Sequence, residues 1–213
     1  MKHAIFDQFS KIGVIPVLEI DSAEHAKPLA EALLKGGLPV AEVTLRTEAA
    51  LDSIRNIARE VPEVLVGAGT VITWEQAEAA RDAGAQFLIS PGMVEQVVIW
   101  AQGHEVPILP GAMTPTEMIR GINLGLDLFK FFPAEVMGGL RAIKAMSDPF
   151  PQLRFIPTGG IHLGNAAEYL QHEKIHAVGG SWMAKRQMIA DGKLEEITRM
   201  AKQASDLVKQ IRK

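Results

Sequence analysis

Short apolar runs rich in β-branched residues recur along the chain and alternate with longer amphipathic stretches. Seven steps of 23 residues on average separate the first run from the last. That period matches one strand plus one helix, and strands that alternate with helices form parallel sheets. Eight similar units predict an α/β fold, a single (β/α)8 TIM barrel, rather than an open sheet. The runs begin near Val14, Val40, Val64, Ala85, Val106, Leu126, Arg154 and Ile175.

Helical periodicity lies between the runs, for example at 22–35, 48–59, 73–82, 114–124 and 138–146. Amphipathic segments at 5–12 and 193–211 predict an extra N-terminal and an extra C-terminal helix. Gly36-Gly37, Gly84 and Gly125 follow predicted helices, where a left-handed C-cap favours glycine. No linker or low-complexity segment interrupts the pattern, so we expect 1–213 to be one TIM-barrel domain.

An open doubly wound sheet that binds a dinucleotide is the architectural alternative, because Gly67 and Gly69 end a predicted strand. The third glycine of the dinucleotide fingerprint is missing from this segment. A turn at the end of a strand therefore explains these two glycines better.

Composition narrows the classes of partner. The formal net charge of -3 gives no basic field to attract nucleic acid or a membrane surface, so we expect a small-molecule partner. Lys2, Asp7 and Lys11 interrupt any apolar signal core, and no stretch has the length of a membrane span, which predicts a cytoplasmic protein. The absence of cysteine excludes disulfides, thiolate metal sites and a cysteine nucleophile.

The second predicted strand carries polar residues on one face. Ala41, Val43 and Leu45 form an apolar face, which leaves Glu42, Thr44 and Arg46 on the other. Alternate side chains of a barrel strand face the lumen, so the polar set should point inward. An ion pair between Glu42 and Arg46 with a purely structural role is the competing interpretation.

Lys130 is expected to lie inside the sixth predicted strand, on the face of Leu128 and Phe132. Desolvation and a neighbouring cation such as Arg46 would favour the neutral amine, which attacks ketones. Alternatively, the stem of Lys130 packs on phenylalanine and its head reaches solvent. Its place near the carboxyl end of a barrel strand favours a catalytic role.

Two paired-glycine segments end the seventh and eighth predicted strands, where barrels commonly bind phosphate through backbone N–H groups. The hydroxyl of Ser181 adds a donor. The predicted phosphate site therefore comprises Gly159, Gly160, Gly179, Gly180 and Ser181. The histidines show no metal-ligand spacing, so we expect no metal.

Six segments together resemble the 2-keto-3-deoxy-6-phosphogluconate (KDPG) aldolase family, which overlaps with 4-hydroxy-2-oxoglutarate aldolase. The resemblance covers nearly the whole chain in order. It implies a homotrimeric lyase of class I, without cofactor, that cleaves KDPG to pyruvate and glyceraldehyde 3-phosphate in the Entner-Doudoroff pathway. The segments are E-V-T-L-R-T-E at 42–48, V-G-A-G-T at 66–70, I-S-P-G at 89–92, F-K-F-F-P-A-E at 129–135, P-T-G-G-I at 157–161 and G-G-S-W at 179–182.

The resemblance also implies residue roles. Lys130 is expected to form an imine (Schiff base) with the substrate, and Glu42 to act as general acid and base. The remaining substrate-binding positions are Arg46 and Thr70 for the pyruvate carboxylate, Pro91 and Phe132 for the walls of the pyruvyl site, Thr158 for the hydroxylated part, and the five phosphate-site residues named above.

Two departures from the family pattern stand out. His162 occupies a position where a helix-capping Ser or Thr is common, which leaves the geometry of the phosphate loop open. The segment Val136-Met137 also differs, without an interpretation from sequence. A phosphosugar isomerase or synthase on the same barrel, or a non-catalytic protein that binds sugar phosphates, remains an alternative. The preference among KDPG, its galactonate epimer and 4-hydroxy-2-oxoglutarate is not set by the sequence.

Overall fold

The computed structural model describes residues 4–212, so residues 1–3 and 213 of the predicted 1–213 domain lie outside the described residues. Strands and helices alternate along the chain as predicted. The strands are β1 (Val14–Leu18), β2 (Val40–Thr44), β3 (Leu65–Gly69), β4 (Leu88–Ile89), β5 (Ile108–Leu109), β6 (Leu128–Phe131), β7 (Arg154–Pro157) and β8 (Val178–Gly180).

The five helices singled out between the runs are confirmed with small shifts of their ends, as are the two terminal helices. Three further helices, α5, α8 and α9, were not singled out from the sequence. The helices are α1 (Ala4–Ile12), η1 (Ala23–His25), α2 (Ala26–Lys35), α3 (Ala50–Glu60), α4 (Trp74–Asp82), α5 (Glu95–Gly103), α6 (Pro115–Asn123), α7 (Gly139–Ser147), α8 (Leu163–Leu170), α9 (Arg186–Ala190) and α10 (Leu194–Ile211).

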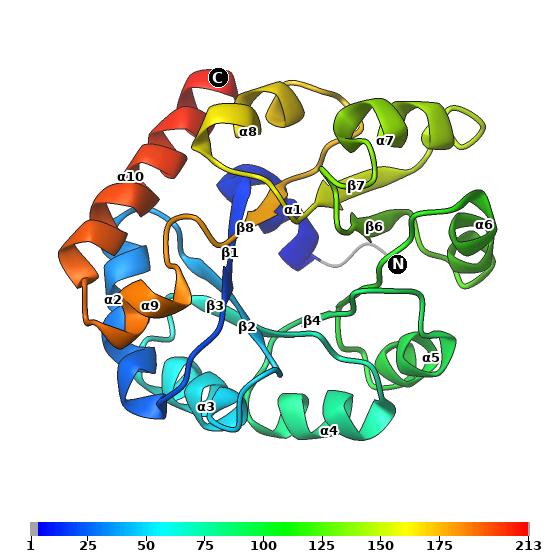
Figure 1. The fold of residues 1–213 in the computed structure, drawn as a ribbon. Helices are drawn as coiled ribbons and strands as arrows, with labels where there is room; N and C mark the ends of the chain where they lie inside the picture. Colours follow the sequence, from blue (N-terminus) through cyan, green and yellow to red (C-terminus); the bar gives the residue numbers. More distant parts are fainter. Residues whose placement is uncertain (1–3, 213) are drawn as a thin grey trace.

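The main sheet is parallel and curled, with most of the helices on its convex side (Figure 1). Its strand order is β5-β4-β3-β2-β1-β8, and β6 and β7 pair in a second, parallel sheet. The order runs consecutively from β5 to β1 and continues to β8, without the reversal at which a doubly wound sheet binds a dinucleotide. Single parallel bridges link Gly111 to Lys130 and Thr158 to Gly179.

Two apolar clusters lie on the two faces of the strands. Val40, Leu128 and Ile156 belong to an inner cluster on the concave side, whereas Ala41 and Val43 belong to the larger cluster beneath the helices. The amphipathic face of α1 contributes Phe9 to the inner cluster, where its ring meets that of Phe87 edge to face at 4.8 Å between centroids. The N-terminal helix therefore completes the inner core, which explains its apolar stripe.

Glycine C-caps follow three of the helices as predicted. Gly37, Gly84 and Gly125 have φ of 85°, 98° and 77°, a region that favours glycine because it lacks a Cβ. Gly36 was included in that prediction wrongly, since it is right-handed with φ of -76°. Its requirement is steric: a Cβ there would lie 2.5 Å from the Cβ of Ala201 on α10.

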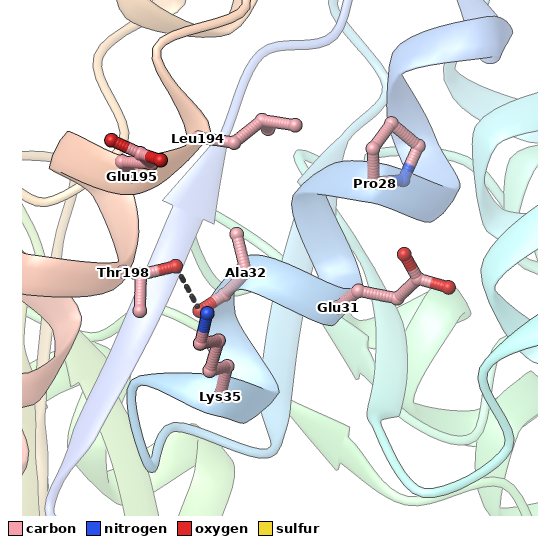
Figure 2. Close-up of a pocket in the computed structure, with 7 residues that line it drawn as sticks. All are labelled: Pro28, Glu31, Ala32, Lys35, Leu194, Glu195 and Thr198. Carbon is pink, nitrogen blue, oxygen red and sulfur yellow. Dashed lines mark hydrogen bonds between the residues drawn. The ribbon is translucent and has the colours of Figure 1, made fainter.

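Helix α10 packs against α2 on the outside of the fold. The Thr198 hydroxyl donates a hydrogen bond of 3.1 Å to the carbonyl of Ala32, as Figure 2 shows. A groove of about 330 Å³ lies beside this contact, lined by Pro28, Glu31, Ala32, Lys35, Leu194, Glu195 and Thr198. Within 4–212, the helices fall short of the length and apolar character needed to cross a bilayer.

Candidate active site

Lys130 lies inside the fold near the carboxyl end of β6. Its backbone N–H donates to the carbonyl of Pro110 at 2.9 Å, and its carbonyl accepts from the N–H of Ala112 at 3.0 Å. Because Leu128 of the same face belongs to the inner cluster, alternation places the side chain of Lys130 on the concave side. The residue is 6% exposed, so the predicted burial of this lysine is confirmed.

Glu42 provides the charged partner of Lys130. The Nζ of Lys130 lies 2.9 Å from Oε1 of Glu42, and Glu42 is only 2% exposed. Gly69 on the adjacent strand β3 makes room for this carboxylate, since a Cβ there would lie 2.4 Å from the same oxygen. The ring of Phe132 adds a face whose centroid lies 5.6 Å from Nζ.

The competing interpretation, a structural ion pair between Glu42 and Arg46, was wrong. Arg46 was considered as a structural ion pair for Glu42 and as a cation beside Lys130. Instead, Nη2 of Arg46 lies 2.9 Å from Oε1 of Glu19, and its Nε donates to the hydroxyl of Thr44 at 3.2 Å. Arg46 follows the end of β2 and reaches the rim, whereas Glu42 lies deeper and meets the lysine 88 residues away.

The Lys130–Glu42 contact places a proton acceptor beside the lysine amine. The amine becomes nucleophilic when it releases its proton. Glu42 lies within hydrogen-bonding distance to accept that proton. A buried lysine and carboxylate in contact can therefore support carbonyl chemistry.

A small inner cavity of about 150 Å³ surrounds this pair. The structure brings together here the six residues expected around the pyruvyl part of a substrate, together with Thr158, which was expected at its hydroxylated part. Thr70, one of the lining residues, has a positive φ of 63°, which is uncommon for a residue other than glycine. The lining consists of Val17, Glu42, Thr44, Arg46, Thr70, Pro91, Lys130, Phe132 and Thr158.

An outer cavity of about 230 Å³ adjoins the inner one, and both share Val17, Arg46, Phe132 and Thr158. Four of the five residues expected to bind phosphate line it. Gly159 and Gly160 have φ of 96° and 77°, so this loop requires glycine for its conformation. Its lining is Val17, Glu19, Arg46, Phe132, Thr158, Gly159, Gly160, Ile161, Gly180 and Ser181.

Gly179 is the exception among the predicted phosphate residues, because it does not line the outer cavity. It is buried within β8 beside Thr158, and a Cβ at this position would lie 2.3 Å from the Thr158 hydroxyl oxygen. Gly179 therefore leaves space for Thr158, which lines both cavities.

The structure places both departures from the family pattern, His162 and the segment Val136-Met137. Nδ1 of His162 accepts a hydrogen bond from the N–H of Gly164 at 3.1 Å, so the imidazole caps α8 in place of a hydroxyl. Asn165 completes the cap by accepting from the His162 N–H at 2.8 Å and donating to the Gly160 carbonyl at 3.1 Å. Val136 and Met137 lie in the turn after β6 and are exposed, and neither lines the two cavities.

A second layer of contacts supports the Gly159-Gly160 loop, and sequence reasoning missed it. The Glu135 N–H donates to the Gly159 carbonyl at 3.1 Å, and its carboxylate accepts a hydrogen bond from the Tyr169 hydroxyl. Burial and this nearby carboxylate raise the pKa of Tyr169 well above its ordinary value, so the phenol remains a donor. The loop is thereby tied to α8.

Glu19 is the other residue that the sequence did not reveal. It follows β1 directly and lies at the same rim as Arg46. A carboxylate one residue beyond the carboxyl end of a predicted strand is the signal that could have identified it. For metals, the described residues 4–212 hold no group of three or more His, Asp or Glu side chains placed to bind an ion.

Known proteins match this chain over most of its length. The family model of KDPG and KHG aldolase matches residues 5–200. The 2-dehydro-3-deoxy-phosphogluconate aldolase of Treponema pallidum (strain Nichols) is 46% identical over 204 residues, 96% of this chain and 97% of that protein. The KHG/KDPG aldolase of Escherichia coli (strain K12) is 47% identical over 191 residues, 90% of each chain.

A solved structure gives the same fold and carries a trapped reaction intermediate. It is the KDPG aldolase of Legionella pneumophila, with pyruvate captured as a covalent carbinolamine. The two structures superpose with a TM-score of 0.89 and are 42% identical, over 92% of this chain and 96% of that chain.

Proposed function

Because the chain belongs to the KDPG and KHG aldolase family, we propose that it is a class I aldolase that cleaves KDPG to pyruvate and D-glyceraldehyde 3-phosphate. The observation that carries the proposal is the buried contact of 2.9 Å between Lys130 and Glu42, inside a cavity large enough for a pyruvyl group. The name of the E. coli relative supports a second substrate, 4-hydroxy-2-oxoglutarate, which would give pyruvate and glyoxylate.

The reaction would begin at the C2 ketone. Lys130 passes its proton to Glu42, and its neutral amine attacks C2 to give a carbinolamine. Glu42 returns that proton to the carbinolamine hydroxyl, which leaves as water and gives a cationic imine that accepts electrons. Glu42 then removes the C4 hydroxyl proton, directly or through water, and the C3–C4 bond breaks. The electrons of that bond enter the imine and leave an enamine of pyruvate. Protonation at C3 and hydrolysis of the imine release pyruvate and Lys130.

The remaining residues would orient the substrate along the two cavities. Arg46 and Thr70 would hold the C1 carboxylate, whereas Pro91 and Phe132 would wall the pyruvyl part. Thr158 lies where the cavities meet, which suits a contact with the hydroxylated carbons. Backbone N–H groups of the loops at Gly159-Gly160 and Gly180, with the hydroxyl of Ser181, would receive the phosphate. Gly179 would act indirectly, through the space it leaves for Thr158.

Borohydride trapping with pyruvate tests the proposal. Reduction converts an imine into a stable secondary amine, so we expect inactivation and a mass increase on the peptide that contains Lys130. Lys130→Ala is the matched control and should gain no mass. A phosphosugar isomerase or a non-catalytic binding protein would show no trapping, and a label on another lysine would overturn the assignment of Lys130.

We further propose that the eight strands close into one TIM barrel that forms a single domain over 1–213. Both edges of the main sheet support closure, because Gly111 bridges to Lys130 on β6 and Thr158, after β7, bridges to Gly179 on β8. A homotrimer and a cytoplasmic location remain predictions. Light scattering coupled to gel filtration would test the trimer, with an expected mass three times the 23.1 kDa of the chain.

A further inference from the structure

The outer cavity offers mostly neutral groups to a phosphate. Its lining contains one cation, Arg46, and one carboxylate, Glu19, which form an ion pair at 2.9 Å. The charge of Arg46 is therefore balanced within the protein. A phosphate in this cavity would depend on the hydroxyl of Ser181 and on backbone N–H groups, and a hydrogen bond weakens steeply when its donor points the wrong way. The orientation of the peptides around the cavity thus decides how well it binds an anion.

The loop after β7 carries two N–H groups that are free to bind a ligand. Those of Gly160 and Ile161 donate no hydrogen bond to any of residues 4–212, and both residues line the outer cavity. Ile161 is only 5% exposed, and backbone N–H groups shielded from water are rarely left without an acceptor. A ligand in the outer cavity can supply that acceptor.

The carbonyls of these two peptides are anchored outside the outer cavity. The N–H of Glu135 donates to the Gly159 carbonyl, and the side-chain amide of Asn165 donates to the Gly160 carbonyl, both at 3.1 Å. Neither Glu135 nor Asn165 lines the outer cavity; both line a separate pocket of about 350 Å³. In a trans peptide the C=O and the N–H point in opposite directions. The anchored carbonyls therefore turn the N–H groups of Gly160 and Ile161 toward the outer cavity.

Asn165 is the anchor that a side chain supplies, whereas Glu135 donates through its backbone. Oδ1 of Asn165 accepts from the His162 N–H at 2.8 Å, and Nδ2 donates to the Gly160 carbonyl. Because an amide oxygen only accepts and an amide nitrogen only donates, these two partners set the orientation of the amide. Asn165 lies in the first turn of α8, so it fixes the loop to a helix.

Resting on the proposed function, we infer that Asn165 is a positioning residue for the distal phosphate of KDPG. Its amide holds the Gly160–Ile161 peptide so that the Ile161 N–H donates to a phosphate oxygen in the outer cavity. Pyruvate needs only the inner cavity, whose lining contains none of residues 159–161. Loss of the amide therefore weakens the binding of KDPG in its transition state and leaves the reaction of Lys130 with pyruvate unchanged.

The test compares two measurements on Asn165→Ala. The first is kcat/KM for KDPG cleavage, and the second is the pyruvate concentration that half-saturates borohydride trapping. We expect kcat/KM to fall about three- to tenfold, the factor that corresponds to one net hydrogen bond, because one donor to the phosphate loses its direction. The half-saturating pyruvate concentration should keep its wild-type value. Both measurements are made at a temperature where wild type and variant are fully folded.

A second variant, Asn165→Asp, separates the loop contact from the cap of α8. A carboxylate keeps an acceptor for the His162 N–H, and a negative charge suits the first turn of a helix. The melting temperature should therefore stay near the wild-type value. The Nδ2 donor is replaced by an oxygen that repels the Gly160 carbonyl, so kcat/KM for KDPG should fall at least as far as in Asn165→Ala. A wild-type kcat/KM in this variant would contradict the inference.

Thr114→Ala is the control for loss of a helix cap. The Thr114 hydroxyl accepts from the N–H of Glu117 on α6 at 3.3 Å, and Thr114 lines neither cavity. This variant should melt at a lower temperature and keep both wild-type measurements. An unchanged kcat/KM for KDPG in Asn165→Ala, or an equal loss in pyruvate trapping, would overturn the positioning role. Absence of both cleavage and trapping in the wild type would instead overturn the proposed function, and this inference with it.

Discussion

Replacing Glu42 by Gln separates a catalytic carboxylate from a structural ion pair. The substitution keeps the shape and the Oε1 acceptor that lies 2.9 Å from the Lys130 amine, but the amide cannot accept the proton of the lysine or of the C4 hydroxyl. Positioned proton transfer contributes roughly 10²- to 10⁴-fold to rate. We therefore expect cleavage to fall by about two to four decades, whereas the fold and some trapping of pyruvate persist.

If the ion pair serves only the fold, Glu42→Gln should lower folding stability rather than the cleavage rate of the folded protein. Breaking a buried ion pair by removing one charge costs about 3 to 5 kcal/mol of folding stability. Both groups are nearly inaccessible, at 2% and 6% exposure, so that cost would be large if the pair served mainly to hold the strands. Thermal melts should be recorded beside steady-state cleavage, measured at a temperature where wild type and variant are fully folded.

A double variant sharpens the comparison. Lys130→Met with Glu42→Met replaces both charges by apolar side chains of similar length, and a purely structural pair would regain stability because apolar replacement of buried pairs is often neutral or stabilising. Cleavage per folded molecule near the wild-type value in Glu42→Gln would refute the catalytic role. A rate loss no larger than expected from the unfolded fraction would do the same.

Two further substitutions test the cavities. Ser181→Ala should lower kcat/KM for KDPG by an amount equivalent to on the order of 1.5 to 3 kcal/mol, the value of one hydrogen bond to a charged group. The kcat/KM for 4-hydroxy-2-oxoglutarate should fall less. Equal losses for both substrates would remove Ser181 from the phosphate site. Gly69→Ala places a Cβ 2.4 Å from Oε1 of Glu42, so the carboxylate must move and cleavage should drop about a hundredfold, as for a 1 Å misplacement. Gly103→Ala, which meets nothing within 4 Å, is its control in kinetics and melts, and similar losses in both would contradict the steric argument.

Much of the fold could be predicted because hydrophobic periodicity shows which face of a helix or strand is buried. The alternation of Val40 and Glu42 with Ala41 and Val43 identified the two faces of β2, and the structure distributes them as predicted between the concave side and the helices. Helix α9 was not predicted because it spans only five residues, too few to show a helical hydrophobic period.

Partners across strands could not be predicted, because they depend on register. The pairing of Leu18 with Val43 places Glu19, the next residue of the chain, at the level of Thr44 and close to Arg46. A shift of one residue would exchange the two faces of a strand and separate these charges. Alternation showed that Glu42 and Lys130 point inward, but only the packing of strands 88 residues apart brings them into contact.

The cap of α8 shows a different limit of sequence patterns. A hydroxyl is common at its N-cap, and His162 therefore left the phosphate loop in question. The physical requirement is an acceptor for the free N–H groups at the start of the helix. Nδ1 of His162 meets it at Gly164, and Asn165 ties the same cap to the carbonyl of Gly160. Residue type at this position is thus less informative than the atom presented to the helix, and that atom is known only once the side-chain conformation is known.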